Sequence, residues 1–291
     1  MKLRNTLFLS VAILILIGFL IQYMYPSRSI TIATTTSLYA TGFLDYIQER
    51  YNEIDPNIVI KIIPLGSGAA LETAARGDAD IVFSHAPNLE KKYIDDGVLI
   101  EWGLIAYNYF IIVGPSDDPA GISNASNVIE AFRRIYQAGE SGEAIFISRG
   151  DRSGTHVREL MIWEKAGLDP EGEWYIESGS GMGDTLLLAN QLNAYTLSDI
   201  GTYTILSGKG RIEGLVKLFE EDDKLLNIYS IYLVSGSVDQ DTMKFYNYIV
   251  DNISDLIREY NNLVGAEIFY PVESYNGDLE AMWIRFSMGD I

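Results

Sequence analysis

Residues 148–156 hold the densest group of potential anion-binding side chains in this sequence. The segment reads Ser-Arg-Gly-Asp-Arg-Ser-Gly-Thr-His and lies between an apolar run and a helical pattern. Arg149 offers a planar fork of donors, while Ser153 and Thr155 offer hydroxyl donors. The first N–H groups of a helix have no partner within it, so a strand-to-helix turn of this kind is suited to an anion. A well-capped helix in any α/β domain has a similar composition, so this segment alone leaves both interpretations open.

Other predicted turns carry the same kinds of residue. Residues 34–37 are Thr-Thr-Thr-Ser and follow a β-branched run, and residues 66–68 are Gly-Ser-Gly before an alanine-rich helical pattern. A short apolar strand ends at residues 84–87, Ser-His-Ala-Pro, and residues 178–183 form a further glycine-rich turn. Several donors aimed at one point make charge-assisted hydrogen bonds, which are stronger than neutral ones. The turns together therefore favour a site for one small anion.

The elements around these turns predict an α/β fold with two lobes. Strands and helices alternate over residues 29–83 in the order β-α-β-α-β, which indicates a parallel sheet with right-handed crossovers. Ligands bind at the carboxyl ends of the strands in such sheets. A strand at residues 108–113 and another at 227–234 predict the two passages between lobes, and a helix over 241–260 is expected to pack on the first lobe. We assign residues 29–112 and 228–291 to the first lobe, and residues 113–227 to the second.

The composition excludes several classes of function. The chain has 40 acidic and 21 basic residues and a net charge of −19, whereas nucleic-acid binding needs clustered Lys and Arg. It has no cysteine, which excludes disulfides, iron–sulfur clusters, thiol nucleophiles and an acylated cysteine. With two histidines in all, a multi-histidine zinc site is not expected. We therefore expect no cofactor and no metal site.

Residues 1–26 have the pattern of a targeting or anchoring segment. Lys2 and Arg4 precede an apolar run from Leu7 to about Ile21. This run is close to the shortest length that spans a membrane, and no clear small-residue cleavage site follows it. A signal peptide and an uncleaved membrane anchor both remain open. The basic residues before the run predict that the rest of the chain lies outside the cytoplasm.

Patterns typical of enzymes are weak. Residues 179–183, Gly-Ser-Gly-Met-Gly, match a nucleophile elbow only in part. Ser153 and His156 are close in sequence, but no third residue is in place to orient the histidine as a base. No Walker lysine pattern is present. The Arg-Gly-Asp tripeptide at residues 149–151 resembles a cell-attachment motif, which is too short to be specific. We therefore predict a binding protein without catalysis.

Four segments together resemble the tungstate-binding subunits of Tup-type ABC importers. They are residues 34–37, residues 148–156, the Gly-Met-Gly-x-Thr-Leu run at 181–186 and the Ala-Tyr-Thr-Leu-x-Asp-x-Gly-Thr-Tyr run at 194–203. The resemblance implies a type II periplasmic-binding-protein fold, a tetrahedral oxyanion as ligand, most closely tungstate, and a membrane permease with its ATPase as partners. We also expect a monomer. Phosphate-binding relatives share part of the second segment. A molybdate or phosphate receptor, an anion-sensing ectodomain, and an enzyme acting on phosphorylated or sulfated substrates therefore remain alternatives.

The resemblance also suggests which residues contact the oxyanion. The expected donors are Thr35, Thr36, Ser37 and Ser67 in the first lobe, and Arg149, Ser153, Gly154 and Thr155 in the second. We assign Asp151 to orienting Arg149. His85 is either a structural histidine or a selectivity residue, because phosphate-binding relatives have an aspartate at the corresponding place and a histidine can donate to a proton-free oxyanion. Ile200 departs from the family, which usually has an arginine there, so we expect an effect on selectivity more than on binding.

Overall fold

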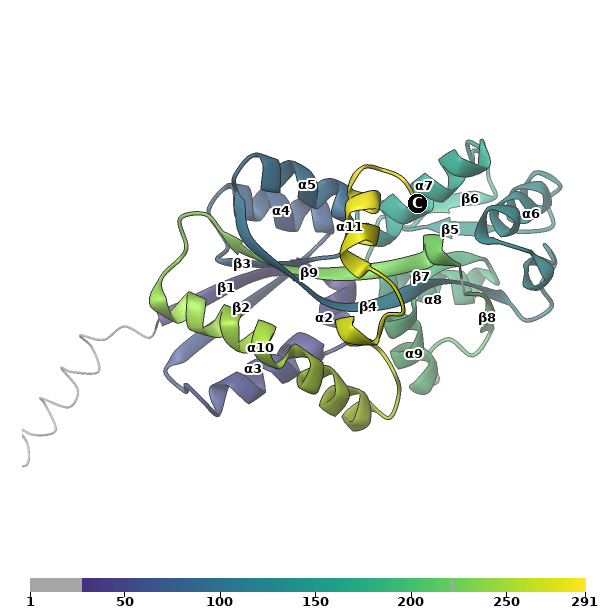
Figure 1. Ribbon diagram of the computed structural model, residues 1–291. Coiled ribbons are helices and arrows are strands. Elements are labelled where there is room, and N and C mark those ends of the chain that lie inside the picture. The colour runs from purple at the N-terminus through teal and green to yellow at the C-terminus, as the bar shows by residue number, and fades with distance from the viewer. Residues whose placement is uncertain (1–27, 221) are drawn as a thin grey trace, which may run out of the picture.

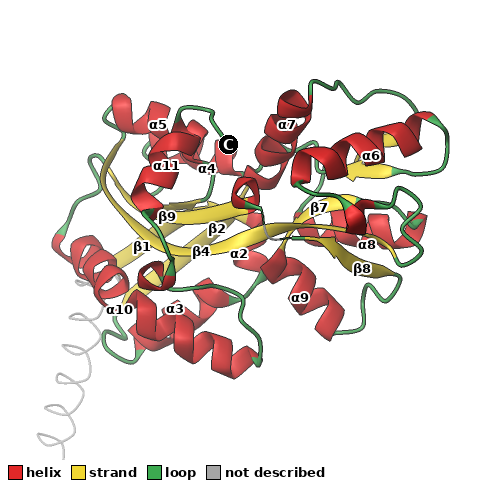
Figure 2. Cartoon of the chain, turned by 45° about the vertical axis from the view of Figure 1, so that its right-hand side comes forward, coloured by secondary structure: helices red, strands yellow, loops and turns green. Residues whose placement is uncertain are grey.

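A computed structural model describes residues 28–220 and 222–291, which form two α/β lobes joined by a long strand (Figure 1). This strand, β4 (Leu99–Pro115), pairs with β9 (Leu226–Val234) as far as Tyr109. From Phe110 onward it pairs instead with strands of the second lobe. Figure 2 shows β4 passing from one lobe to the other. The continuous strand therefore connects the two parts of the molecule that hold the predicted donors.

The main sheet of the described chain has seven strands in the order β2-β1-β3-β9-β4-β7, with β8 also paired to β4. The strands not yet delimited are β1 (Arg28–Thr35), β2 (Ile58–Leu65), β3 (Ile81–Ser84), β7 (Thr196–Asp199) and β8 (Leu215–Phe219). β1 is parallel to both β2 and β3, as the β-α-β-α-β order predicted. β9 is antiparallel to β3 and β4.

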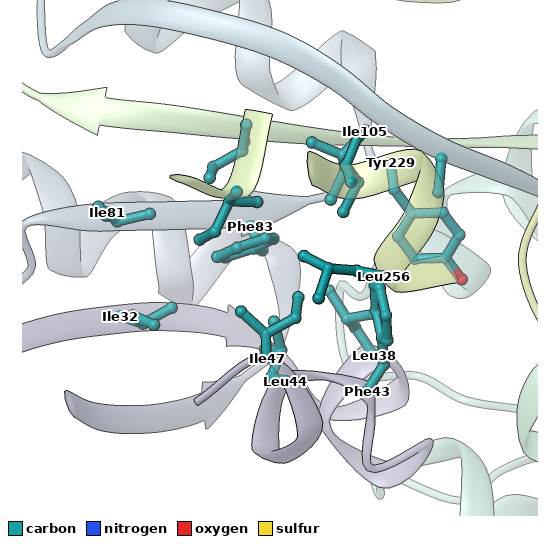
Figure 3. Close-up of a cluster of buried hydrophobic side chains, with 14 of the residues drawn as sticks. Ile32, Leu38, Phe43, Leu44, Ile47, Ile81, Phe83, Ile105, Tyr229 and Leu256 are labelled. Carbon is teal, nitrogen blue, oxygen red and sulfur yellow. The ribbon is translucent and has the colours of Figure 1, made fainter. Parts of the chain in front are cut away.

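The first lobe buries apolar side chains on both faces of its sheet, because successive residues of a strand point to opposite faces. Ile81 and Phe83 of β3 join one cluster, whereas Val82 joins another. The first cluster is covered by α3 (Phe43–Asn52) and α10 (Gln240–Val264), and Figure 3 shows its centre. The predicted packing of the helix over residues 241–260 on this lobe agrees with the structure. The opposite face packs on α4 (Ser67–Ala75) and α5 (Pro87–Asp95).

The second lobe repeats this two-sided arrangement. Phe110 and Ile112 of β4 pack with α6 (Val128–Glu140) and α7 (Gly154–Ala166). Ile111 and Val113 face α8 (Met182–Leu192) and α9 (Ile200–Gly208) on the other side. Two short parallel strands, β5 (Phe146–Ser148) and β6 (Tyr175–Glu177), complete the lobe. This packing fixes the turn after β5, where Arg149 lies.

The structure also differs from the expected elements. β4 has 17 residues, far more than the predicted 108–113. The sequence did not predict its first part because exposed and buried residues follow no regular alternation there, around Gly103. The threonine-rich turn after β1 is itself the start of a short helix, α2 (Thr36–Ala40). α5, β6, β8 and the C-terminal helix α11 (Leu279–Ser287) were not predicted. α11 packs against α5, and its Trp283 and Phe286 enter the apolar cluster that contains Phe110.

The predicted signal peptide or anchor, residues 1–26, lies outside the described residues. Of the helices in residues 28–220 and 222–291, none combines the length and apolar character that a membrane span requires.

Candidate functional site

The predicted turns meet where the two lobes touch. The first lobe contributes the end of β1 with Thr35, the start of α2 with Thr36 and Ser37, the start of α4 with Ser67, and His85 after β3. The second lobe contributes the turn after β5 with Arg149 and Asp151, and the start of α7 with its cap Ser153 and the helical residues Gly154 and Thr155. At these turns, two hydrogen bonds join the lobes directly. Arg149 Nη2 donates to Thr36 Oγ1 at 3.1 Å, and Gly154 N donates to Ser67 Oγ at 3.1 Å. The structure therefore brings the turns of both lobes to one place.

Two of the hydroxyls also cap helices. Thr35 Oγ1 accepts from Leu38 N at 3.2 Å at the start of α2. Ser153 Oγ accepts from His156 N at 3.2 Å at the start of α7. A side-chain oxygen at this position satisfies one of the free N–H groups of the first turn. A hydroxyl that accepts in this way keeps its own hydrogen for donation to another group. Capping and anion binding are thus compatible at both turns.

Arg149 has the strongest donor group of the site and is 1% exposed. Its Nη2 donates to Asp151 Oδ2 at 2.5 Å as well as to Thr36. Within residues 28–220 and 222–291, its Nε and Nη1 have no hydrogen-bond partner. Burial lowers the pKa of Arg149, while the neighbouring Asp151 and Asp199 raise it. Because arginine keeps its charge in proteins, a buried cation is left with free donors, which a negatively charged group could satisfy.

Asp151 contacts both the arginine and the helix start. Its Oδ1 accepts from Ser153 N at 3.1 Å while its Oδ2 pairs with Arg149. One carboxylate therefore fixes the guanidinium relative to α7. Thr155, in the first turn of the same helix, is fully buried, and its Oγ1 also lacks a partner in the described part of the chain. The site has free donors at two of its predicted residues.

His156, in the first turn of α7, has a defined tautomer. Its Nδ1 accepts from Arg152 N at 3.0 Å. Since burial lowers the pKa of His156, the neutral ring carries its hydrogen on Nε2. Nε2 is buried without a partner among the described residues. His156 is a donor that our sequence analysis did not place in the site, although it belongs to the predicted segment.

His85 lies between the lobes and is 3% exposed. Its ring stacks on Tyr229, with the two ring centroids 5.0 Å apart. Its Nδ1 is 2.8 Å from Asn227 Oδ1 and its Nε2 is 3.2 Å from Ser37 Oγ. Burial lowers the pKa of His85 to about 4, so the ring is neutral at physiological pH. His85 Nε2 thus contacts the hydroxyl of one of the predicted oxyanion donors, Ser37. A role of His85 in anion selectivity stays a prediction.

The amide partners of His85 were not predicted from the sequence. Asn227 contacts His85, and its Nδ2 donates to Asn108 Oδ1 at 2.8 Å and to Tyr229 OH at 2.9 Å. Both asparagines are buried in strands made mostly of apolar residues. A lone asparagine in an apolar strand signals a hydrogen-bonded polar group, because buried amides seldom lack partners. An asparagine in such a strand does not, however, tell which residue it contacts.

Ile200, the position that departs from the family pattern, begins α9 and lies beside the buried Asp199. It lines a surface pocket of about 430 Å³ together with Tyr109, Asp222 and Tyr270. None of the predicted oxyanion donors lines this pocket.

Known proteins share both the sequence pattern and the fold. Residues 26–252 match the PBP superfamily domain. The tungstate-binding protein TupA of Peptoclostridium acidaminophilum is 35% identical over 252 residues, which are 84% of this chain and 85% of that protein. A Haloferax volcanii protein named as an ABC transporter anion-binding protein is 48% identical over 177 residues, 61% of this chain. The chain spans half of that protein's length.

A crystal structure described as the tungstate ABC transporter from Geobacter sulfurreducens has the same fold. It is 37% identical, covers 81% of this chain and 100% of its own, and superposes with a TM-score of 0.70. These similarities confirm the predicted two-lobed fold and the predicted family. The chain belongs to the PBP superfamily and, within it, to the family of the TupA tungstate-binding proteins.

Proposed function

We propose that this protein is the extracytoplasmic receptor of an ABC importer and captures a tetrahedral oxyanion, most closely tungstate, between its two lobes. The observation that carries the proposal is the buried guanidinium of Arg149, whose Nε and Nη1 have no partner among the described residues. One carboxylate, Asp151, already pairs with this cation. The remaining donors suit a second anionic group, and charge-assisted hydrogen bonds of this kind are strong.

The predicted residues would act from both sides. Thr35, Thr36, Ser37 and Ser67 are the proposed donors of the first lobe, and Arg149, Ser153, Gly154 and Thr155 those of the second. Asp151 would orient Arg149 through the contacts described above. We retain residues 29–112 with 228–291, and residues 113–227, as the proposed lobes. Closure of two lobes around a ligand is a standard transition for binding proteins.

Tungstate is favoured over phosphate because of proton content. Tungstate has no proton at neutral pH and can only accept hydrogen bonds, whereas phosphate keeps at least one proton and benefits from an acceptor. The proposed site consists mainly of N–H and O–H donors. The relatives named above as tungstate-binding proteins support the same ligand. Molybdate remains the alternative, since it has the same charge and shape.

Delivery to a membrane permease and its ATPase completes the proposed role. The relatives named as ABC transporter components support it. We propose that the protein acts as a monomer, without a chemical step, and is either held at the membrane by its N-terminal segment or secreted. The proposal of membrane attachment or secretion rests on the sequence of residues 1–26.

Titration calorimetry with tungstate tests the function, followed by competition with molybdate, sulfate and phosphate. We expect one tungstate per chain and little binding of phosphate. If phosphate binds as tightly as tungstate, a phosphate receptor becomes the better description. If none of the four anions binds, the proposed function is wrong.

A further inference from the structure

A chain of buried amides determines which nitrogen of His85 carries a hydrogen. Asn108 Nδ2 donates to the backbone oxygen of Ile268 at 3.1 Å. A carbonyl oxygen only accepts, so this contact fixes the orientation of the Asn108 amide, and Asn108 Oδ1 is the atom that faces Asn227. Asn227 must then present its Nδ2 to Asn108, at 2.8 Å, and its Oδ1 to His85, at 2.8 Å. His85 Nδ1 therefore carries a hydrogen and donates.

The other nitrogen of the neutral ring is an acceptor. With its hydrogen on Nδ1, neutral His85 has a lone pair on Nε2, 3.2 Å from Ser37 Oγ. Ser37 has a single hydroxyl hydrogen, which it must donate to this nitrogen. Thr35 Oγ1, 3.3 Å from Ser37 Oγ, can donate to Ser37 in turn. Ser37 thus has no hydrogen left for a third partner while His85 stays neutral.

A proton-free oxyanion conflicts with this arrangement. Such an anion accepts hydrogen bonds and donates none, so Ser37 can contact it favourably only by giving it the hydroxyl hydrogen. Ser37 Oγ would then have to accept from His85 Nε2, and Nε2 would need a hydrogen of its own. Because Nδ1 already carries one, the ring would be an imidazolium.

We propose that binding of a proton-free oxyanion takes up one proton at His85 Nε2, which reverses the hydrogen bond to Ser37 and makes Ser37 a donor to the anion. The inference rests on the proposed function of this site. The proton comes from the buffer and joins the lone pair of Nε2, and no other bond is made or broken. A hydrogen phosphate ion could instead donate its own proton to Ser37 Oγ and leave His85 neutral. This one contact therefore does not discriminate against phosphate, and the preference for tungstate rests on the other donors of the site.

The charges that face His85 set the direction of this change. Burial is the main cause of its low pKa, the hydrogen bond to Asn227 raises the pKa, and the cations Arg149 and Arg158 lower it. The one carboxylate that raises it is Asp151. The remaining neighbours are uncharged: Ser37 on α2, Phe110 on β4, Tyr229 on β9, whose pKa burial raises well above its usual value, and the backbone of Gly154 on α7. A bound dianion adds negative charge and favours the protonated ring.

This coupling gives the affinity a defined pH dependence. Because the anion raises the pKa of His85, the complex binds more protons than the free protein between the two pKa values. Affinity for tungstate therefore falls, by up to about tenfold per pH unit, as pH rises from the pKa of His85 in the free protein to its pKa in the complex. The affinity is constant below the first value and above the second. Phosphate affinity has no such dependence on His85.

Calorimetry in buffers of different protonation enthalpy measures the proton directly. At about pH 7.5, we expect tungstate binding to take up a large fraction of a proton in the full-length protein. The variant H85Q keeps an acceptor for Ser37 but cannot be protonated, so the uptake should vanish. In the control Arg152→Lys, the altered side chain is exposed, and the uptake should remain. Tungstate binding without proton uptake, or with equal uptake in H85Q, overturns the inference but leaves the receptor function intact. Absence of binding by any oxyanion overturns the function itself.

Nuclear magnetic resonance of the histidine rings gives a second test that needs no variant. The chain has two histidines, so ¹⁵N-histidine labelling yields two ring systems. The free protein should show His85 with a hydrogen on Nδ1 alone, and the tungstate complex should show hydrogens on both nitrogens. A neutral His85 ring in the tungstate complex contradicts the proposal.

Discussion

Arg149 illustrates how one buried side chain can define a binding site. Removing a cation from water is costly unless it is paired, and Arg149 is 1% exposed. Asp151 and Thr36 satisfy its Nη2, whereas Nε and Nη1 have no partner in the described part of the chain. Such an arrangement gains stability when an anion binds. The arginine is thus where folding and ligand binding are most directly linked.

The variant Arg149→Lys should bind tungstate about ten- to a hundredfold more weakly. Lysine keeps the charge but replaces the planar fork by a single ammonium on a flexible stem. Titration calorimetry measures the change. Arg152→Lys is the matched control, because the Arg152 side chain is exposed and only its backbone N–H contacts the site. An unchanged affinity in Arg149→Lys would remove this residue from the site.

His85→Asp should reduce the preference for tungstate over phosphate. The carboxylate adds negative charge against a dianion and offers an acceptor for the proton of phosphate. His85→Asn is the control, since it has nearly the same size without the charge. We expect the His85→Asp variant to bind tungstate at least about tenfold more weakly than the His85→Asn variant. Equal tungstate-to-phosphate ratios in the two variants would show that charge at this position does not control selectivity.

Helices and strands differed in how well the sequence predicted them. β1, β2 and β3 and the helices between them were found because β-branched runs alternate with helical periodicity. The first part of β4 was missed because its side chains follow no regular alternation. α11 was missed because the helix is short and its role depends on contacts with α5, which are remote in sequence. Local pattern therefore predicts elements better than it predicts their partners.

The site shows the same limit. Hydroxyl and glycine residues at strand ends predicted the turns after β1 and β5, because their composition is local. The link from His85 to Asn227 and Asn108 joins residues far apart in sequence, and no local pattern encodes it. The direction of the hydrogen bond to Ser37, which decides whether that hydroxyl can donate, depends on this link.

A buried carboxyl between α7 and β6 predicts a pH dependence of stability. Glu159 Oε1 accepts from Tyr175 OH at 2.7 Å and from Trp163 Nε1 at 3.3 Å. Burial raises the pKa of Glu159 from 4.5 to about 7. The folded protein therefore holds this proton more tightly than the unfolded chain. The bound proton on Glu159 stabilises the fold fully at low pH. This stabilisation is lost as pH rises from the pKa of Glu159 in the unfolded chain to its pKa in the folded protein.

Glu159→Gln should remove this pH dependence, because glutamine does not titrate and keeps the accepting oxygen. The free energy of unfolding of the natural protein should decrease between about pH 5 and about pH 8. In the variant this decrease should be smaller by about 1–3 kcal/mol. Urea denaturation at several pH values measures it. Glu164→Gln, an exposed position on the same helix, is the control. Parallel pH profiles for the natural protein and Glu159→Gln would contradict the assignment.

The two lobes meet closely enough for single glycines to matter. A Cβ atom at Gly154 would lie 2.8 Å from His85 Cε1 and 2.9 Å from the His85 backbone oxygen. Real Cβ atoms do not approach other atoms so closely, and no flexible side-chain end is available to move away. The beginning of α7 therefore requires glycine in order to contact the first lobe.

Gly154→Ala should weaken tungstate binding by preventing the lobes from meeting, while the fold itself is retained. Overpacking of this kind costs about 1–3 kcal/mol, or about five- to a hundredfold in affinity. Gly68→Ala is the matched control, since its Cβ would lie 3.9 Å from the Arg152 backbone oxygen, an ordinary contact. Calorimetry gives the affinities, and thermal unfolding shows that both variants fold. Equal affinities would mean that this contact is not part of the bound state.

The most direct test of the account is small-angle X-ray scattering of the natural protein with and without tungstate. The lobes touch in the structure, so donors divided between them can admit a small anion only if the lobes first part and then close around it. The predicted result is a smaller radius of gyration at saturating tungstate, with no change on adding phosphate. Identical scattering curves with and without tungstate, in a sample shown by calorimetry to be saturated, would contradict capture between the lobes.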